Sequence, residues 1–194
     1  ILLTRTPALT GRYEFLSFRN AAGGRAWLSA IREKAQSAAE VMASVEKDKR
    51  WVTLAFTWNG LRALGVDEGS LATFPEEFKQ GMVARAEMLG DTGENHPDNW
   101  VGGLASPDLH ASAILFARDA AERSRCLTEH DQLVAQCEGV EVLSTLDPEA
   151  TPPFDYAHDH FGYRDRLSQP VIEGTGEVPT PGTGTPLKPG EFIL

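Results

Sequence analysis

The amino-acid sequence predicts an α+β fold in which four strands and the helices between them are followed by an irregular C-terminal arm. Three observations lead to this prediction. Four strand-like segments occur, and helical patterns lie between the first and second, between the second and third, and between the third and fourth. The composition then shifts to Pro, Gly and Thr after Asp147. The 194 residues suffice for one domain with a sizeable core plus an extension.

Two strands are predicted in the first part of the chain. RYEFLSFRN (residues 12–20) alternates, so that Tyr13 and Phe15 face one way and Leu16 faces the other. RWVTLAFTW (residues 50–58) is rich in β-branched and aromatic residues, which favours a buried strand.

Helices are predicted after each of these strands. Ala-Ala-Gly-Gly (residues 21–24) breaks the first strand, and a helix follows from Arg25 with apolar residues at helical spacing. Asn59 suits the N-cap of the short helix GLRALG. A further helix is predicted over Phe74 to Gly90, because a proline and two glutamates open it and an apolar stripe follows.

The second part of the chain repeats the strand–helix–strand pattern. A polar, glycine-rich loop (residues 91–106) precedes a strand over His110 to Asp119, a long helix over residues 120–139 and a strand over Val140 to Asp147. The order β-α-β-(α,α)-β-α-β is that of the ferredoxin-like, split β-α-β fold. Its antiparallel sheet carries the long helices on one face, and the other face must be solvated or covered by something else.

We expect residues 1–150 to form this ferredoxin-like domain and residues 151–194 to form the irregular arm. The 18 basic and 28 acidic residues give a net charge of -10, which argues against nucleic acid as a partner. No apolar run approaches the roughly 20 residues that cross a bilayer, so no membrane partner is expected. No signal-peptide pattern is visible, and the compartment, cytoplasmic or secreted, stays open.

Histidine and cysteine pairs suggest little chemistry by themselves. Cys126 and Cys137 lie about 11 positions apart in one predicted helix, roughly 16 Å along its axis, so free thiols are predicted rather than a disulfide. His158 and His160 form an HxH pair without matching ligands elsewhere, which favours loop histidines over a metal site. His96 is predicted to be a loop residue, and structural or solvated roles are predicted for His110 and His130.

Residues 1–150 contain no established catalytic motif. GxSxG, P-loop, Rossmann and CxxC patterns are absent, so hydrolase, nucleotide-binding and thioredoxin-like functions lack support. Pairs of carboxylates are expected by chance in so acidic a chain; they are Asp91 with Glu94 and Asp155 with Asp159.

The arm segment HFGYRDRLSQP (residues 160–170) resembles the GxxDG signature region of dye-decolourising (DyP-type) peroxidases, in which HFGFxDGxSQP is typical. Other blocks are similar to that family in the same order: FTWNGLRALGV (56–66), FPEEFKQGMVARAEMLGD (74–91), the Trp100 loop, DLHASAILFA (108–117) and PGEFIL (189–194). The resemblance covers nearly the whole chain.

The resemblance implies a haem peroxidase of two ferredoxin-like domains that reduces hydrogen peroxide and oxidises organic substrates, dyes among them. Asp165 matches the family's distal aspartate, which takes a proton from peroxide and returns it to the leaving oxygen. Arg166, Leu167 and Ser168 match the segment whose backbone runs against the haem edge, and Gly162 matches the first glycine of the motif.

The residues beside Asp165 both support and complicate this role. Arg164 and Arg166 would favour the ionised carboxylate that the chemistry requires. Arg166, however, replaces the second glycine of the motif, and its bulk and charge could narrow the pocket or pair with a haem propionate.

The chain resembles only the N-terminal half of such an enzyme. The family's proximal histidine and distal arginine lie in its second domain, so the axial ligand of haem b is expected outside this chain. A second ferredoxin-like domain, or a partner chain, would complete the molecule and cover the free sheet face.

Two other functions remain open: a non-catalytic binding or structural module whose Arg166 closes the haem site, and a deferrochelatase-like release of iron from haem. Several aromatic residues could relay electrons to the surface, although packing is the favoured role for each; they are Trp51, Trp58, Trp100, Tyr156 and Tyr163.

Overall fold

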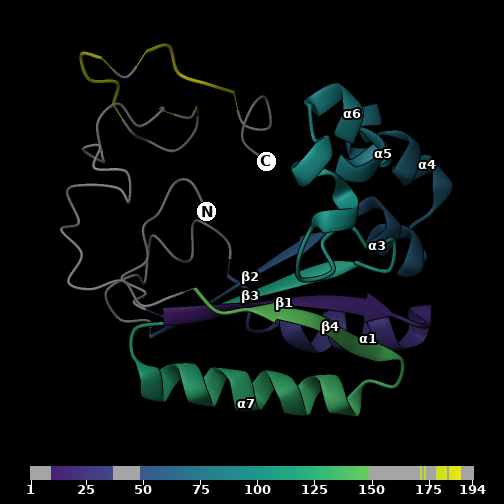
Figure 1. Ribbon diagram of the computed structural model, residues 1–194. Coiled ribbons are helices and arrows are strands. Elements are labelled where there is room, and N and C mark those ends of the chain that lie inside the picture. Colours follow the sequence, from purple (N-terminus) through teal and green to yellow (C-terminus); the bar gives the residue numbers. More distant parts are fainter. Residues whose placement is uncertain are drawn as a thin grey trace. The chain divides into compact units, whose positions relative to one another are not determined.

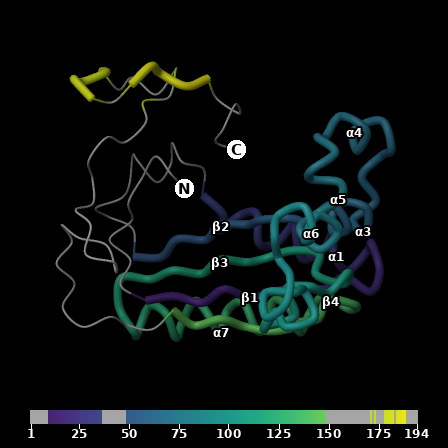
Figure 2. Tube along the Cα trace, turned by 45° about the horizontal axis from the view of Figure 1, so that its top comes forward, coloured from purple at the N-terminus to yellow at the C-terminus, as the bar shows by residue number. Residues whose placement is uncertain are grey.

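Four strands form one antiparallel sheet in the order β2-β3-β1-β4, as the traces in Figures 1 and 2 show. The strands are β1 (Thr10–Phe18), β2 (Arg50–Phe56), β3 (Ala111–Ala117) and β4 (Val140–Leu146). In the central pair, Tyr13 lies opposite Ile114, and the pairing of β1 with β4 shifts register between Phe15 and Leu16. This is the strand order of the predicted split β-α-β arrangement.

Two long helices, α1 (Ala21–Arg32) and α7 (Ala120–Gln136), cover the same face of the sheet (Figure 1). The chain between β2 and β3 forms a group of short helices that lie together near one end of the strands (Figure 2). This group comprises α3 (Trp58–Ala63), α4 (Glu68–Ala72), α5 (Glu76–Ala84), α6 (Ala86–Leu89), η1 (Gly93–Asn95) and η2 (Pro97–Asn99). The ferredoxin-like prediction is therefore confirmed.

The structure is a computed structural model that describes residues 10–36, 49–148, 171, 173, 178–182 and 184–188. The chain divides into two compact units, Leu3–Ala150 and Thr151–Leu194. In the second unit, the backbone N–H of Leu187 donates to the Val171 carbonyl at 2.8 Å, and that of Glu173 donates to the Leu187 carbonyl at 2.9 Å. No helix in the described ranges is long and apolar enough to span a membrane.

The core lies between the sheet and the two long helices. Alternate strand residues face it, as predicted for β1, where Leu16 is fully buried and packs with Trp27 of α1 in one cluster. Small residues of β3, Ala111 and Ala113, leave room for the large side chains of the helices. On the opposite face, Tyr13 packs edge-on against Phe116 at a ring-centroid distance of 5.8 Å.

Helix α1 begins four residues earlier than predicted, so residues 21–24 are its first turn rather than a break. Asn20 is the N-cap, and its Oδ1 accepts a hydrogen bond from the Gly23 N–H at 2.7 Å. A Cβ at Gly23 would lie 1.9 Å from the carbonyl oxygen of Glu138. Gly23 therefore allows close packing of the helix start against the turn after α7, which the sequence pattern did not indicate.

Helix α3 is capped by Thr57 rather than by Asn59. The Thr57 hydroxyl accepts from the Gly60 N–H at 3.0 Å and donates to the Leu109 carbonyl at 2.6 Å. Asn59 instead donates to the Pro107 carbonyl at 3.0 Å. Both side chains thus bind the segment that leads into β3.

The single helix predicted over residues 74–90 is divided into α5 and α6. Gly81 has φ 70°, and Arg85 separates the two helices with φ −103° and ψ 0°. The division leaves Met82 with 56% of its surface exposed, so the predicted apolar stripe is not continuous. Phe78 keeps its inward role, since it packs against Phe74 and Trp58.

Candidate functional site

The predicted distal segment lies outside the described residues. This applies to Asp165, to the adjacent Arg166, Leu167 and Ser168, and to the HxH pair at His158 and His160. Their roles therefore stay predictions, and the site below is built from residues 10–148.

Two of the histidines accept hydrogen bonds from backbone N–H groups. His110 Nδ1 accepts from the Phe18 N–H at 2.8 Å, and the two rings stack with centroids 5.7 Å apart. Burial lowers the pKa of His110, so its neutral, accepting form is favoured. His96 Nδ1 accepts from the Asp98 N–H at 3.3 Å at the start of η2. No group of three metal-ligating side chains occurs among the described residues.

The third histidine, His130, lies at the centre of a buried polar network. Its Nδ1 is 2.7 Å from Oε2 of Glu14, and its Nε2 is 3.1 Å from Nε1 of Trp27. All three side chains are at most 2% exposed. The network joins β1, α1 and α7 inside the core, so the structural role predicted for His130 is confirmed.

The tautomer of His130 follows from the chemistry of its partners. An indole N–H can only donate, so Nε2 of His130 accepts from Trp27 and carries no proton. The ring proton is then on Nδ1, which donates to the Glu14 carboxylate. Both ring nitrogens are occupied, and His130 is therefore not free to act as a base or as an iron ligand.

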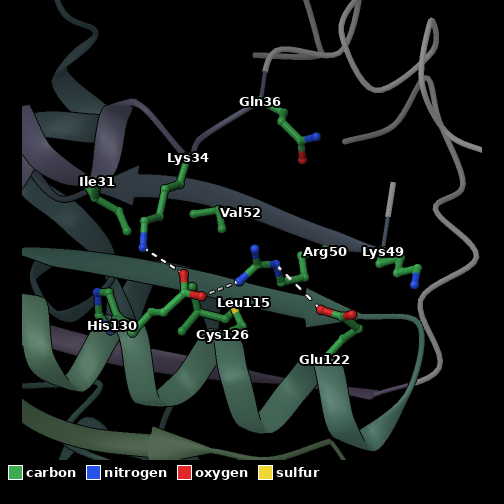
Figure 3. Close-up of a pocket in the computed structure, with 11 residues that line it drawn as sticks. Ile31, Lys34, Gln36, Lys49, Arg50, Val52, Leu115, Glu122, Cys126 and His130 are labelled. Carbon is green, nitrogen blue, oxygen red and sulfur yellow. Dashed lines mark hydrogen bonds and ion pairs between the residues drawn. The ribbon is translucent and has the colours of Figure 1, made fainter. Parts of the chain in front are cut away.

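A cavity of about 420 Å³ lies next to this network, between α1, β2, β3 and α7 (Figure 3). Its inner wall contains Cys126, one turn before His130 on the same side of α7. At its mouth, Glu129 accepts from Lys34 Nζ at 2.9 Å and from Arg50 Nη1 at 2.8 Å. Arg50 Nε also lies 3.8 Å from Glu122 Oε2.

The cysteine in this cavity is not an activated nucleophile. Burial raises the pKa of the Cys126 thiol, and the nearby Arg50 guanidinium only partly opposes that shift. The imidazole one turn away accepts from Trp27 and cannot take the thiol proton. Cys126 and Cys137 are both buried and free, as predicted from their spacing.

Asp147 ties the end of β4 to β1 and α7. Its Oδ1 is 2.7 Å from Nε of Arg12, and its Oδ2 is 3.0 Å from Nη2 of Arg12 and 2.8 Å from Nη2 of Arg123. The hydrogen bond from Arg12 is the main cause that lowers the pKa of Asp147 to about 2.

We expect Asp147→Asn to reduce the free energy of unfolding by about 1 kcal/mol or less near neutral pH, because the carboxylate is 46% exposed and solvent screens the pairs. The folded-state pKa lies below the ordinary value of 3.8, so the contribution is present above pH 4 and is lost as pH falls towards 2. Denaturation of wild type and variant from pH 6 to pH 2 measures this difference. The exposed Glu87→Gln is the control, and a difference that does not shrink in acid would contradict the prediction.

Comparison with known proteins identifies the family. The sequence model of the DyP dimeric alpha+beta barrel domain matches residues 3–147. The chain belongs to this family. Its sheet and both long helices fall within the matched residues, and the resemblance found in the sequence is confirmed.

Relatives named as peroxidases extend this result. Peroxidase 2 of Mycetinis scorodonius is 31% identical over 181 residues, which cover 93% of this chain and 34% of that protein. A dye-decolorizing peroxidase of Mycena epipterygia is 29% identical over 143 residues, or 74% of this chain and 25% of that protein. The chain thus spans about a third or less of these DyP relatives.

Solved structures agree with the DyP fold. An ancestral D-type dye decolorizing peroxidase matches with a TM-score of 0.78 and 26% identity, covering 95% of this chain and 40% of that chain. The decolorizing peroxidase of Auricularia auricula-judae matches with a TM-score of 0.73 at 21% identity, which supports the fold alone.

The cavity in Figure 3 does not fit the haem expected for a DyP-type peroxidase. The histidine in its lining, His130, has both ring nitrogens engaged. The thiol in its lining, that of Cys126, stays protonated. To ligate iron, His130 would have to give up a hydrogen bond and Cys126 would have to lose its proton.

Sequence reasoning did not identify the Glu14–His130–Trp27 network, although a signal for it was present. Glu14 shares the alternation of Leu16, so a carboxylate was placed on the core face of β1. His130 lies four residues after the inward Cys126. A charged residue facing the core requires a buried partner, and His130 is that partner.

Proposed function

We propose that the protein carrying this chain is a DyP-type haem peroxidase that reduces hydrogen peroxide and oxidises dyes or other organic substrates. The chain contributes a ferredoxin-like domain, residues 1–150, and an arm, residues 151–194, that bears Asp165. The observation that carries the proposal is the DyP family match over residues 3–147, together with relatives named as dye-decolorizing peroxidases.

Asp165 is proposed as the acid–base group of the distal side. Haem, when bound, supplies the iron at which peroxide is reduced. The Asp165 carboxylate accepts a proton from one peroxide oxygen and returns it to the other, which leaves as water. Arg164 and Arg166 would favour the ionised form of this carboxylate, and the segment of Arg166, Leu167 and Ser168 would help to hold the haem.

The free face of the sheet is proposed to meet the second ferredoxin-like domain or a partner chain, which supplies the axial ligand. Helices α1 and α7 both lie on the other face (Figure 1). Half-buried apolar side chains such as Phe15, Ile114 and Phe116 alternate with the core residues and point away from these helices. A second sheet would bury them.

One feature favours a second candidate function. Arg166 stands where the DyP motif has glycine, and a bulky cation there could exclude haem and leave a non-catalytic module. A protein that binds haem but removes its iron is the third alternative.

Reconstitution of the complete protein with haemin separates these functions. We expect a Soret band at one haem per chain and dye oxidation that depends on hydrogen peroxide. Arg166→Gly is the matched variant, and unchanged affinity and activity would show that the arginine is tolerated. A non-catalytic module would give no Soret band until glycine is restored at position 166. A protein that removes iron from haem would instead give the spectrum of free porphyrin.

A further inference from the structure

The cavity between α1, β2 and α7 has an apolar interior that the peroxidase function does not use. Its inner wall is formed by Ile31, Val52, Leu115 and Cys126, each less than 10% exposed. The Cys126 thiol is uncharged and adds a small apolar surface. A volume of about 420 Å³ lies in the range of small-molecule sites.

Among the described residues, the mouth of this cavity carries one more positive than negative charge. Lys34, Lys49 and Arg50 line it together with Glu122 and Glu129 (Figure 3). Glu122 is moreover paired with Arg125 at 2.8 Å outside the lining. Within the described part of the chain, no carboxylate pairs with Lys49.

This local excess of cations occurs in a chain whose net charge is -10. A cationic mouth on a strongly acidic protein attracts anions to that place and disfavours them elsewhere. The arrangement, an apolar interior below a cationic rim, matches a ligand with an apolar body and one anionic end. At the described mouth, a cationic ligand would meet three cations against two carboxylates, and a fully polar anion would leave the inner wall unused.

We propose that this cavity binds a small carboxylate with an apolar body. The body lies against Ile31, Val52 and Leu115, and the carboxylate lies at the mouth near Lys49 and Arg50. Glu129 holds Arg50 and Lys34 in place across the mouth, from α7 to the end of α1 and the start of β2. The bound molecule covers Cys126, whereas Cys137 lies outside the cavity lining.

The position of Cys126 supplies a direct readout. The complete protein is titrated with octanoate, and modification of Cys126 by methyl methanethiosulfonate, a small uncharged reagent, is followed by fragment mass spectrometry. We expect octanoate to slow modification of Cys126 with saturation and to leave Cys137 unchanged. Octan-1-ol and octylammonium are the neutral and cationic controls, and both should protect at least tenfold more weakly. 3-Phenylpropionate distinguishes an aromatic from an aliphatic body.

Two variants test the roles of the rim and of the interior. Lys49→Glu reverses an exposed charge at the mouth and should weaken octanoate binding about tenfold, since attraction is replaced by repulsion. Arg62→Glu on α3 makes the same change of charge away from the cavity and should leave binding unchanged. Cys126→Met adds a longer side chain to the inner wall, and calorimetry should then detect weaker octanoate binding.

The proposal is overturned if octanoate does not protect Cys126, or if Lys49→Glu and Arg62→Glu bind it equally well. Equal protection by octan-1-ol would also overturn it, because the cationic rim would then take no part. These outcomes are independent of haem binding and of peroxidase activity, so they do not depend on the proposed function.

Discussion

Replacement of Asp165 by asparagine is expected to lower kcat/KM for hydrogen peroxide by at least about 100-fold in the haem-loaded protein, as general acid–base groups contribute on the order of 10²–10⁴ in rate. Asparagine keeps the shape of the side chain but cannot accept the peroxide proton at neutral pH. The measurement is the rate of dye oxidation against peroxide concentration.

The control for this experiment is a carboxylate of the same arm. Glu173 is exposed, and Glu173→Gln should keep both the Soret band and the wild-type rate. If Asp165→Asn binds haem and turns over peroxide at the wild-type rate, Asp165 is not the distal acid–base group. Loss of the Soret band in Asp165→Asn would instead assign the residue to haem binding, and the rate would then be compared at equal haem occupancy.

The strand order of this domain was predictable because each strand has a simple sequence signal. Alternation in β1 separates Leu16 from Tyr13, and β-branched and aromatic residues mark β2. The helical pattern over residues 120–139 predicts α7, whose N-cap the structure places at Asp119. With two helices of sufficient length between pairs of strands, the split β-α-β topology follows.

The start of α1 and the division at Gly81 were not predictable, since glycine has more than one use. Gly23 lies in the first turn of α1, and glycine is required there because the Glu138 carbonyl, more than 100 residues away in the sequence, leaves no room for a Cβ. Gly81 by contrast takes a positive φ in open space and interrupts the helix. The helix propensity of glycine is the same at both positions, so only the tertiary structure shows that one glycine continues a helix and the other interrupts it.

The candidate site was predictable only in part, because some of its residues come together only in the folded chain. The residues that resemble a DyP motif are contiguous in the sequence, as around Asp165, and a local pattern suffices to find them. The cavity instead combines Lys34, Arg50 and Glu129, which come from three separate segments of the chain. No spacing rule connects such residues before the fold is known.

The largest effect on stability is expected at His130. Replacement by leucine keeps the volume roughly constant but leaves the Glu14 carboxylate buried, with Oε1 already lacking a hydrogen-bond partner and Oε2 losing its own. The Trp27 N–H loses its acceptor as well. Without the hydrogen bond from neutral His130, a buried carboxylate oxygen is left unsatisfied, which costs about 3 kcal/mol, so the free energy of unfolding of the domain should fall by about that amount.

Hydrogen exchange of peptides from β1 and β3 in the complete protein measures this loss for the domain itself, independently of other domains. The double variant Glu14→Leu/His130→Leu is the informative comparison. It removes the buried carboxylate, whose remaining charged contact is Arg12 Nη1 at 4.0 Å from Oε1, so we expect it to be about 2 kcal/mol more stable than His130→Leu alone. A double variant as unstable as the single one would show that the cost comes from packing of the imidazole. The stability of this core would then depend on shape at position 130 and not on the charge of Glu14.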